Sequence, residues 1–142
     1  VWNRASWYPQ GTDLALHQPN AAVLCYPVVS AGKYAHRGSF EQLAGDDMEK
    51  QQAFSLENLV SPDMPRTFLW HTLTDETVPV ENSLLLEKSL RRAGVSHEMH
   101  LFPHGVHGLA LADMETSDIE KGRLPDRHIA RWQVLCAEWL KE

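Results

Sequence analysis

Short runs rich in apolar and aromatic residues recur along the chain, at residues 21–29, 67–72 and 97–102. The first run is apolar throughout, which is typical of a parallel strand buried on both faces. Turn-forming residues lie next to these runs, and we predict that each forms a strand. We expect residues 21–29 to form a central strand, with strands along both edges and helices on both faces.

Apolar residues at helical spacing predict helices between and after these strands. One helix begins at Val78, where Pro79 suits the first turn, and reaches Ala93, with Gly94 placed to end it. An amphipathic helix closes the chain over residues 129–140. We expect shorter helices at residues 13–17, 40–43 and 48–54. Strands that alternate with helices through short connections predict an α/β fold, a parallel sheet covered by helices.

Composition and charge are those of a globular domain. The 142 residues are 43% hydrophobic and 23% charged, and 13 basic against 19 acidic residues give a net charge of −6. An acidic balance without a basic cluster argues against nucleic acid and membrane surfaces as partners. Because no signal peptide pattern is visible, we expect a cytoplasmic protein. Residues 1–142 are assigned to one domain, with a surface excursion at about residues 30–60.

Cysteine and histidine residues raise the question of a disulfide or a metal site. Cys25 and Cys136 each lie in an apolar stretch, so we predict two buried thiols and no bridge. Zinc requires three or four convergent ligands. Alternation along a strand would turn His97 and His100 to opposite faces. We therefore predict neither a metal nor a cofactor, although four histidines are closely spaced: His97, His100, His104 and His107.

Two residues that can do chemistry follow neighbouring predicted strands. Asp75 follows residues 67–72, and His107 follows residues 97–102. Sites on open α/β sheets lie at the carboxyl ends of the strands. An acid followed along the chain by a histidine matches the order of a Ser-Asp-His triad on such sheets. We predict that Asp75 hydrogen-bonds to His107 and fixes its tautomer, with Glu76 and Asp63 as alternative acids.

Longer motifs surround both residues. FLWHT precedes Asp75, VPVENS follows it, and FPxGxHGL contains His107. Together with the segments YPV and SP and the tryptophan-containing last helix, they resemble the C-terminal half of acetyl-esterase and xylan-esterase-like α/β-hydrolases, relatives of lipases and prolyl oligopeptidases. The resemblance covers nearly the whole chain. It implies hydrolysis of small esters with short acyl groups, including acetyl groups on sugars, without metal or cofactor. It also implies that Asp75 is the triad acid and His107 the triad base.

The nucleophile of that family is a serine in a Gly-x-Ser-x-Gly turn, and the chain contains no such pentapeptide. Ser30 comes closest, but Val28 stands in place of the first glycine and the segment follows a later strand, so we interpret Ser30 as a decoy. Residues 1–3 resemble the stretch after the nucleophile helix. The resemblance therefore implies that the nucleophile and oxyanion hole lie in an upstream half or a partner chain. An open sheet edge would also favour homo-oligomers.

A different class of function stays open, because a fold does not determine an activity. The chain could be a non-catalytic binding or interaction module on a doubly wound scaffold.

Two other histidines follow or precede the candidate site residues. We expect His71 to lie near the mouth of the site without a catalytic role, and His104 to face solvent.

Overall fold

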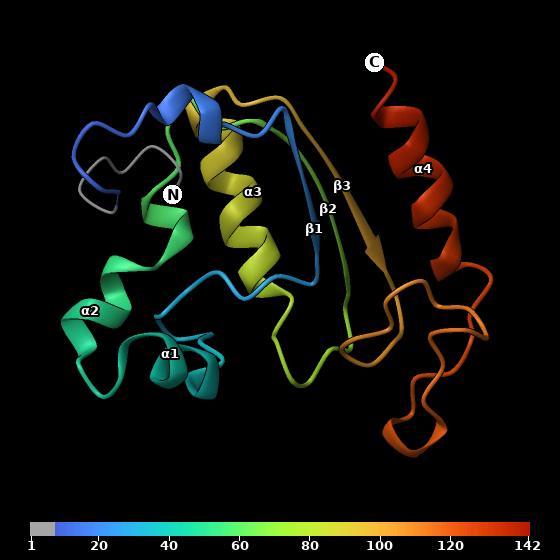
Figure 1. Cartoon of the computed structure of the whole chain (residues 1–142). Helices are drawn as coiled ribbons and strands as arrows, with labels where there is room; N and C mark the ends of the chain where they lie inside the picture. The colour runs from blue at the N-terminus through green and yellow to red at the C-terminus, as the bar shows by residue number, and fades with distance from the viewer. Residues whose placement is uncertain (1–7) are drawn as a thin grey trace.

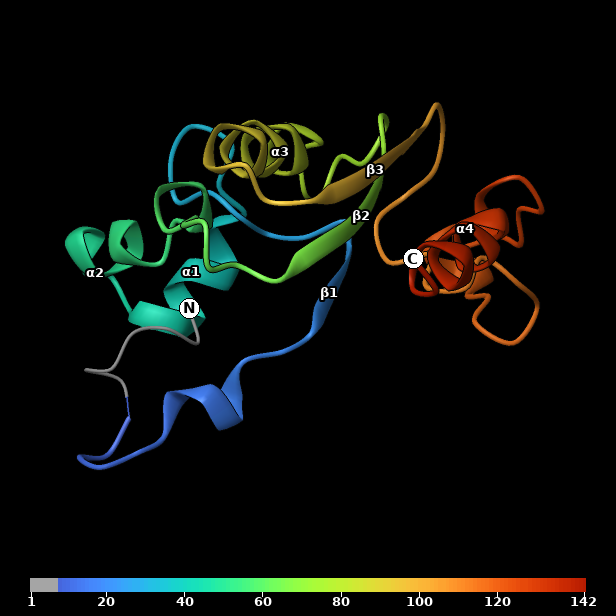
Figure 2. The same cartoon turned by 90° about the horizontal axis from the view of Figure 1, so that it is seen from above.

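A computed structural model describes residues 8–142 (Figure 1). In this part of the chain a parallel sheet has the strand order β1-β2-β3. Its strands are β1 (Ala21–Cys25), β2 (Arg66–Thr72) and β3 (His97–Phe102). Helix α3 (Glu81–Ala93) packs on one face, and α4 (Trp132–Trp139) lies on the other (Figure 2). The predicted α/β fold is confirmed.

Short helices lie before β1 and in the connections. Those at residues 14–17, 37–44 and 48–53 lie close to the predicted positions, whereas the helical turns at residues 56–58 and 119–121 were not predicted. Between β1 and β2 lie α1 (Arg37–Ala44) and α2 (Met48–Ala53). The 3-10 helices are η2 (Leu14–His17), η3 (Leu56–Asn58), η4 (Ile119–Lys121) and η5 (Ile129–Arg131). The predicted C-terminal helix is therefore divided, because its first turn is η5 and α4 begins at Trp132.

Side-chain alternation along β2 builds the two halves of the core. Phe68 and Trp70 belong to the cluster that packs against α4, whereas Leu69 belongs to the cluster that packs against α3. All three side chains are fully buried. β2 lies between β1 and β3, and its side chains are buried on both faces of the sheet.

β1 is shorter than its prediction. It ends at Cys25 because Tyr26 adopts a φ of 40° and Pro27 has no N–H to offer a neighbouring strand. The chain then turns toward α3, where the backbone N–H groups of Val29 and Ser30 donate to Asn82 Oδ1 at 3.0 and 2.9 Å. Residues 26–29 therefore form a loop in which Val29 is fully buried and residues 26–28 are half-buried.

The prediction that strands lie along both edges of residues 21–29 is met on one edge in the described part of the chain, and the strand on the other edge stays a prediction. Within residues 8–142, β1 is an edge strand that pairs with β2 alone. Val23, in the middle of β1, is 40% exposed. The unpaired edge of β1 is therefore where the second neighbouring strand is expected.

The two ends of α3 show how local sequence sets its length. At the C-terminus Gly94 has a φ of 71°, its N–H donates to Arg91 O, and Val95 N–H donates to Leu90 O. This is the glycine-terminated ending that the sequence predicts. The helix begins at Glu81 and not at residue 78, because the preceding residues form a turn around Asp75.

Cys25 and Cys136 are free thiols; Cys136 is buried, as predicted, whereas Cys25 is only half-buried. Burial raises the pKa of both. Within residues 8–142, no helix combines the length and the apolar character needed to cross a membrane.

Candidate active site

The loops after β2 and β3 are joined by hydrogen bonds at the carboxyl ends of these strands. Thr74 Oγ1 accepts the N–H of Gly105 at 2.9 Å and donates to its carbonyl oxygen at 3.2 Å. Thr72 Oγ1 donates to the same carbonyl oxygen at 2.9 Å. Gly105 has a φ of 152°, and a Cβ there would lie 2.7 Å from Thr72 Cγ2 and 2.8 Å from Leu109 Cδ1. Glycine is therefore required where the two loops meet.

Gly105→Ala is expected to lower the free energy of unfolding by about 1–3 kcal/mol, because the added methyl group overpacks a closed contact. Denaturant titration of the variant measures this change. Gly38→Ala is a matched control, since Gly38 lies in α1 and a Cβ there would meet its nearest atom at 3.8 Å. Equal stabilities for the Gly105 variant and the wild type would contradict the steric reason.

The joined loops bring Asp75 and His107 together. Asp75 Oδ2 accepts a hydrogen bond from His107 Nδ1 at 2.8 Å, as predicted from the sequence. Asp75 Oδ1 accepts the backbone N–H groups of Thr77 and Val78 at 2.9 and 2.8 Å. The Asp75 side chain is 1% exposed, whereas that of His107 is 25% exposed. The pair therefore has a buried carboxylate and an imidazole that reaches solvent.

Asp75 is held in its charged form. Burial raises the pKa of the carboxyl, but the N–H groups of His71, Val78 and His107 together outweigh burial and lower the pKa below its ordinary value of 3.8. The carboxylate is thus ionised at neutral pH and accepts the Nδ1 proton of His107. This leaves Nε2 as the nitrogen of His107 that can accept another proton.

The lowered pKa predicts a pH-dependent stability. Asp75 has a lower pKa in the folded chain than in the unfolded chain, so its contacts stabilise fully above the unfolded pKa and are lost as pH falls through the folded pKa. We expect the stability difference between wild type and Asp75→Asn to be constant above about pH 5 and to shrink below about pH 4. Denaturant unfolding across this range measures it, with exposed Asp63→Asn as control. A difference independent of pH would contradict this account.

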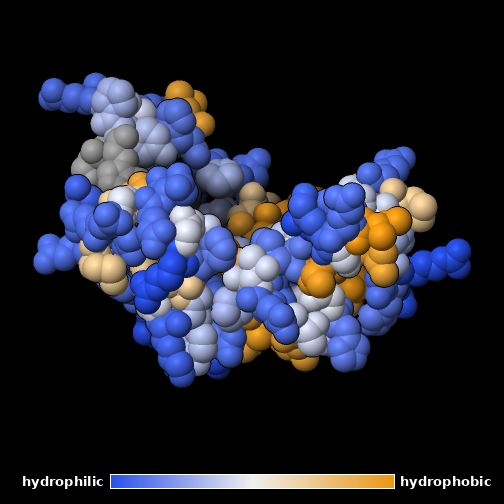
Figure 3. Space-filling model, turned by 90° about the horizontal axis from the view of Figure 1, so that it is seen from below, coloured by the Kyte–Doolittle hydropathy of each residue, from blue (hydrophilic) through white to orange (hydrophobic). Residues whose placement is uncertain are grey.

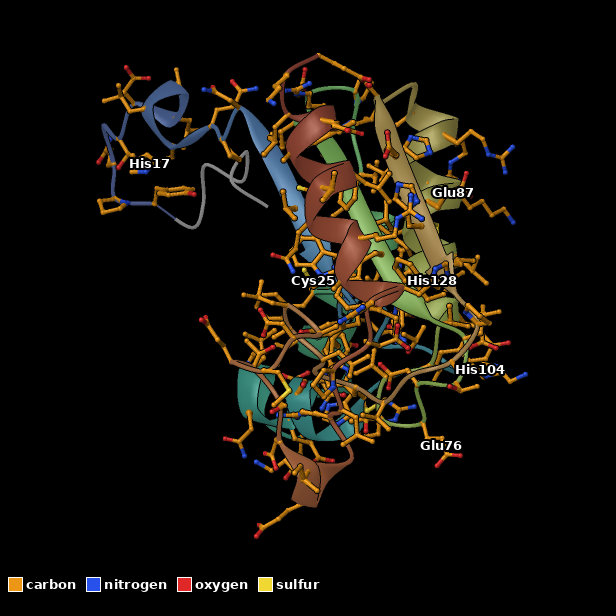
Figure 4. The ribbon with its side chains drawn as sticks, turned by 90° about the vertical axis from the view of Figure 1, so that its right-hand side faces the viewer. His17, Cys25, Glu76, Glu87, His104 and His128 are labelled. Carbon is orange, nitrogen blue, oxygen red and sulfur yellow. The ribbon has the colours of Figure 1, made fainter. Side chains whose placement is uncertain are left out.

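The alternative acids lie elsewhere. Glu76 is exposed, and Figure 4 shows its side chain pointing away from the sheet. Asp63 is exposed and precedes β2, at the opposite end of that strand from Asp75. His104 is exposed on the loop after β3, as expected, and also points outward in Figure 4. Geometry therefore favours Asp75 as the partner of His107.

Ser30 is buried, with 3% exposure, and its Oγ accepts the N–H of Gly32 at 3.1 Å. Among residues 8–142, no serine hydroxyl hydrogen-bonds to the ring of His107. The position of Ser30 agrees with its interpretation as a decoy. Residues 1–3, which resemble the stretch after a nucleophile helix, lie outside the described residues.

The position of His71 differs from the one that the sequence predicts. The sequence places it near the mouth of the site, but the side chain is fully buried. Its Nε2 donates to Val78 O at 2.9 Å and lies 3.3 Å from Asp75 Oδ2. Alternation along β2 turns His71 toward α3, on the same side as Leu69, and this pattern could have shown its burial.

Tyr26 is a site residue that sequence reasoning used only as part of a motif. Its ring lies edge-on to the ring of His107, with centroids 4.8 Å apart. The phenol oxygen accepts the N–H of Ala110 at 3.1 Å, and burial raises the pKa of the phenol. Contacts with Asp75 and Tyr26 together restrict how the imidazole of His107 can turn.

The clustered histidines lie apart in the structure. On β3, His97 Nε2 lies 3.6 Å from Glu87 Oε1 of α3, whereas the ring of His100 contacts Phe68 in the cluster that packs against α4. The two side chains thus lie on opposite faces of the sheet. Within residues 8–142, no group of three or more His, Cys, Asp or Glu side chains is arranged to hold a metal ion.

Comparison with known proteins identifies the fold family. The profile of the prolyl oligopeptidase family matches residues 17–121, a segment that contains both Asp75 and His107. The chain belongs to the prolyl oligopeptidase family.

Two solved members of the α/β-hydrolase fold resemble the chain. It superposes with a TM-score of 0.72 and 43% identity on an acetyl ester-xyloside bifunctional hydrolase from Caldicellulosiruptor lactoaceticus, covering 87% of this chain and 42% of the relative. For a carboxylesterase from Lactobacillus plantarum, the TM-score is 0.71 and the identity 30%, over 87% of this chain and 44% of the relative. Both of these relatives of the prolyl oligopeptidase-family chain are named as hydrolases of esters.

An endo-1,4-beta-xylanase B from Butyrivibrio fibrisolvens is 37% identical over 109 residues, which is 75% of this chain and 17% of the relative. The chain therefore spans less than half the length of each of these three relatives.

A hollow of about 660 Å³ opens beside His107 in this member of the family. Besides His107, six residues line it: Thr74, Glu76, Thr77, Val106, Lys121 and Arg123. Arg123 Nε also donates to the backbone carbonyl of His107 at 3.1 Å. The sequence did not predict Lys121 and Arg123 at this site, because they come from the irregular segment between β3 and α4 and no motif marks them.

Proposed function

We propose that the chain supplies the acid and base of a serine esterase, with Asp75 as the triad acid and His107 as the base. The hydrogen bond between Asp75 Oδ2 and His107 Nδ1 carries this proposal, because it joins a buried carboxylate to an imidazole that reaches solvent. Membership of a hydrolase family supports it.

In this mechanism His107 transfers one proton in each of two half-reactions. Nε2 accepts the proton of the nucleophile serine as its oxygen attacks the ester carbonyl carbon, and then donates it to the oxygen of the departing alcohol. Nε2 next takes a proton from a water molecule as the water oxygen attacks the acyl carbon. The bond between the acyl carbon and the serine oxygen then breaks, Nε2 returns the proton to that oxygen, and the carboxylic acid leaves. Asp75 stabilises the imidazolium in each half and remains ionised throughout.

We place the nucleophile and the oxyanion hole in a preceding half of the same domain or in a partner chain. Two features of residues 8–142 support this. The backbone of β1 is unpaired along one edge, which offers a place for a further strand, and the exposed Val23 offers apolar surface to an element that covers the sheet face. Figure 3 shows a notch between the arm that carries the N-terminal segment and the opposite arm, with apolar side chains at its base. The length of the relatives agrees with a larger domain.

The substrate proposed is a small ester with a short acyl group, acetylated sugars included. The hollow beside His107 supports a hydroxyl-rich alcohol part, because threonine hydroxyls and charged groups in its lining can hydrogen-bond to such a group. The relatives named for acetyl ester-xyloside hydrolysis and for xylanase activity favour the same class.

The test joins the chain to its nucleophile-bearing half and measures hydrolysis of p-nitrophenyl acetate, p-nitrophenyl octanoate and acetylated xylo-oligosaccharides. We expect hydrolysis of the acetyl esters, weak hydrolysis of the octanoate, and inactivation by a serine-directed organophosphate. If no ester is hydrolysed and the organophosphate does not label the protein, the proposal fails. The second candidate, a binding or interaction module on the same scaffold, would then be favoured.

A further inference from the structure

His71 is fully buried, and its ring lies beside the carboxylate of Asp75 that His107 also contacts. Its imidazole contacts three groups: Asp75 Oδ2 at 3.3 Å, Val78 O at 2.9 Å and Ser83 Oγ at 2.7 Å. The mechanism above uses none of these contacts.

The partners of the ring fix its protons. Nε2 faces a carbonyl oxygen and a carboxylate oxygen, both acceptors, so it carries a hydrogen. In the neutral ring Nδ1 then accepts the hydroxyl proton of Ser83, which lies on α3. The result is a series of hydrogen bonds in which Ser83 donates to His71, and His71 donates toward Asp75 and Val78.

This series of hydrogen bonds acts on both oxygens of Asp75. The Nε2–H of His71 lies beside Oδ2, the oxygen that also accepts the proton of His107. The same N–H fixes the carbonyl of Val78, and the N–H of Val78 donates to Oδ1 at 2.8 Å. Rotation of the carboxylate away from His107 would therefore break contacts at both oxygens.

We propose that His71 is a positioning residue, which together with Ser83 holds the Asp75 carboxylate in the orientation that His107 requires. The effect on rate rests on the proposed esterase function, whereas the effect on the Asp75–His107 hydrogen bond does not. A displacement of about 1 Å at a catalytic group costs about 10²-fold in rate. The loss of His71 should therefore lower kcat and leave substrate binding unchanged.

Two replacements separate positioning from packing in the enzyme that contains this chain and its nucleophile-bearing half. Gln can place an amide N–H near the position of Nε2, whereas Leu fills similar space without a donor. We expect His71→Leu to lower kcat about 100-fold with KM nearly unchanged, and His71→Gln to recover most of the loss. Titration of competent sites with an organophosphate corrects kcat for misfolded protein.

Ser83→Ala tests the hydrogen bond that is one residue further from Asp75. It removes the donor to Nδ1 of His71 and leaves His71 in place. We expect a smaller fall in kcat. His100→Leu is the control, since His100 lies on β3 and contacts Glu98 and Phe68 instead of Asp75. It should keep the wild-type kcat.

A second measurement does not depend on esterase activity. The proton between Asp75 and His107 gives a downfield ¹H NMR resonance, which we expect to shift or broaden in His71→Leu and to persist in His71→Gln and His100→Leu. If the wild type hydrolyses no ester, the proposed function fails and this resonance alone decides the role of His71. Wild-type kcat and resonance in His71→Leu would overturn the inference. If that variant does not fold, the same result in Ser83→Ala would overturn it.

Discussion

Asp75→Asn is expected to lower kcat about 10⁴-fold in the esterase that contains this chain, the effect of the same change in a known triad. The Asn side chain has the same shape, and its oxygen can still accept the N–H groups of Thr77 and Val78. Its amide nitrogen would then face Nδ1 of His107 and donate to it. The imidazole would carry its proton on Nε2, where the mechanism needs an acceptor.

The fold should survive this change, since the replacement is isosteric and the loop keeps its backbone contacts with Gly105. Initial rates on p-nitrophenyl acetate, at protein concentrations counted by organophosphate titration, measure the effect. Asp63→Asn is the matched control, because Asp63 is an exposed carboxylate before β2, at the opposite end of that strand, and its loss should keep the wild-type rate. Near-wild-type hydrolysis by Asp75→Asn would remove Asp75 from the triad and make Glu76 the next acid to test.

The contact between Asp75 and His107 could be predicted because it depends on topology more than on detail. Strands β2 and β3 match residues 67–72 and 97–102 closely, and the α3 helix between them ends at Gly94, as its sequence predicts. Two strands joined by one helix are parallel, so their carboxyl ends meet at one edge. Both chemical groups follow those ends.

Features that depend on long-range partners could not be predicted in the same way. The positive φ of Tyr26 ends β1 where the composition alone continues the strand. Arg123 reaches the backbone of His107 from a segment without periodic pattern. His71 is an intermediate case, because strand alternation determines its face, but only the packed structure shows that Asp75 and Ser83 lie within its reach.

The second large effect that we expect is self-association of the isolated chain, and it follows from the unpaired edge of β1. Val23 is 40% exposed in the middle of this strand, and within residues 8–142 only β2 pairs with it. Unpaired backbone N–H and C=O groups on an edge strand favour association with another strand. We expect the 142 residues alone to dimerise or aggregate, and to hydrolyse no p-nitrophenyl acetate above background, because they lack the proposed nucleophile.

Light scattering after size-exclusion chromatography measures the association, and a matched pair of variants locates it. Val23→Lys should reduce self-association, because a charge on an edge strand opposes pairing. Val134→Lys changes an exposed valine on α4 and should have no such effect. The upstream half, in cis or as a separate polypeptide, should restore a soluble, organophosphate-sensitive esterase. A monomeric and active preparation of the isolated chain would refute this prediction, and Ser30 would become the first nucleophile to test.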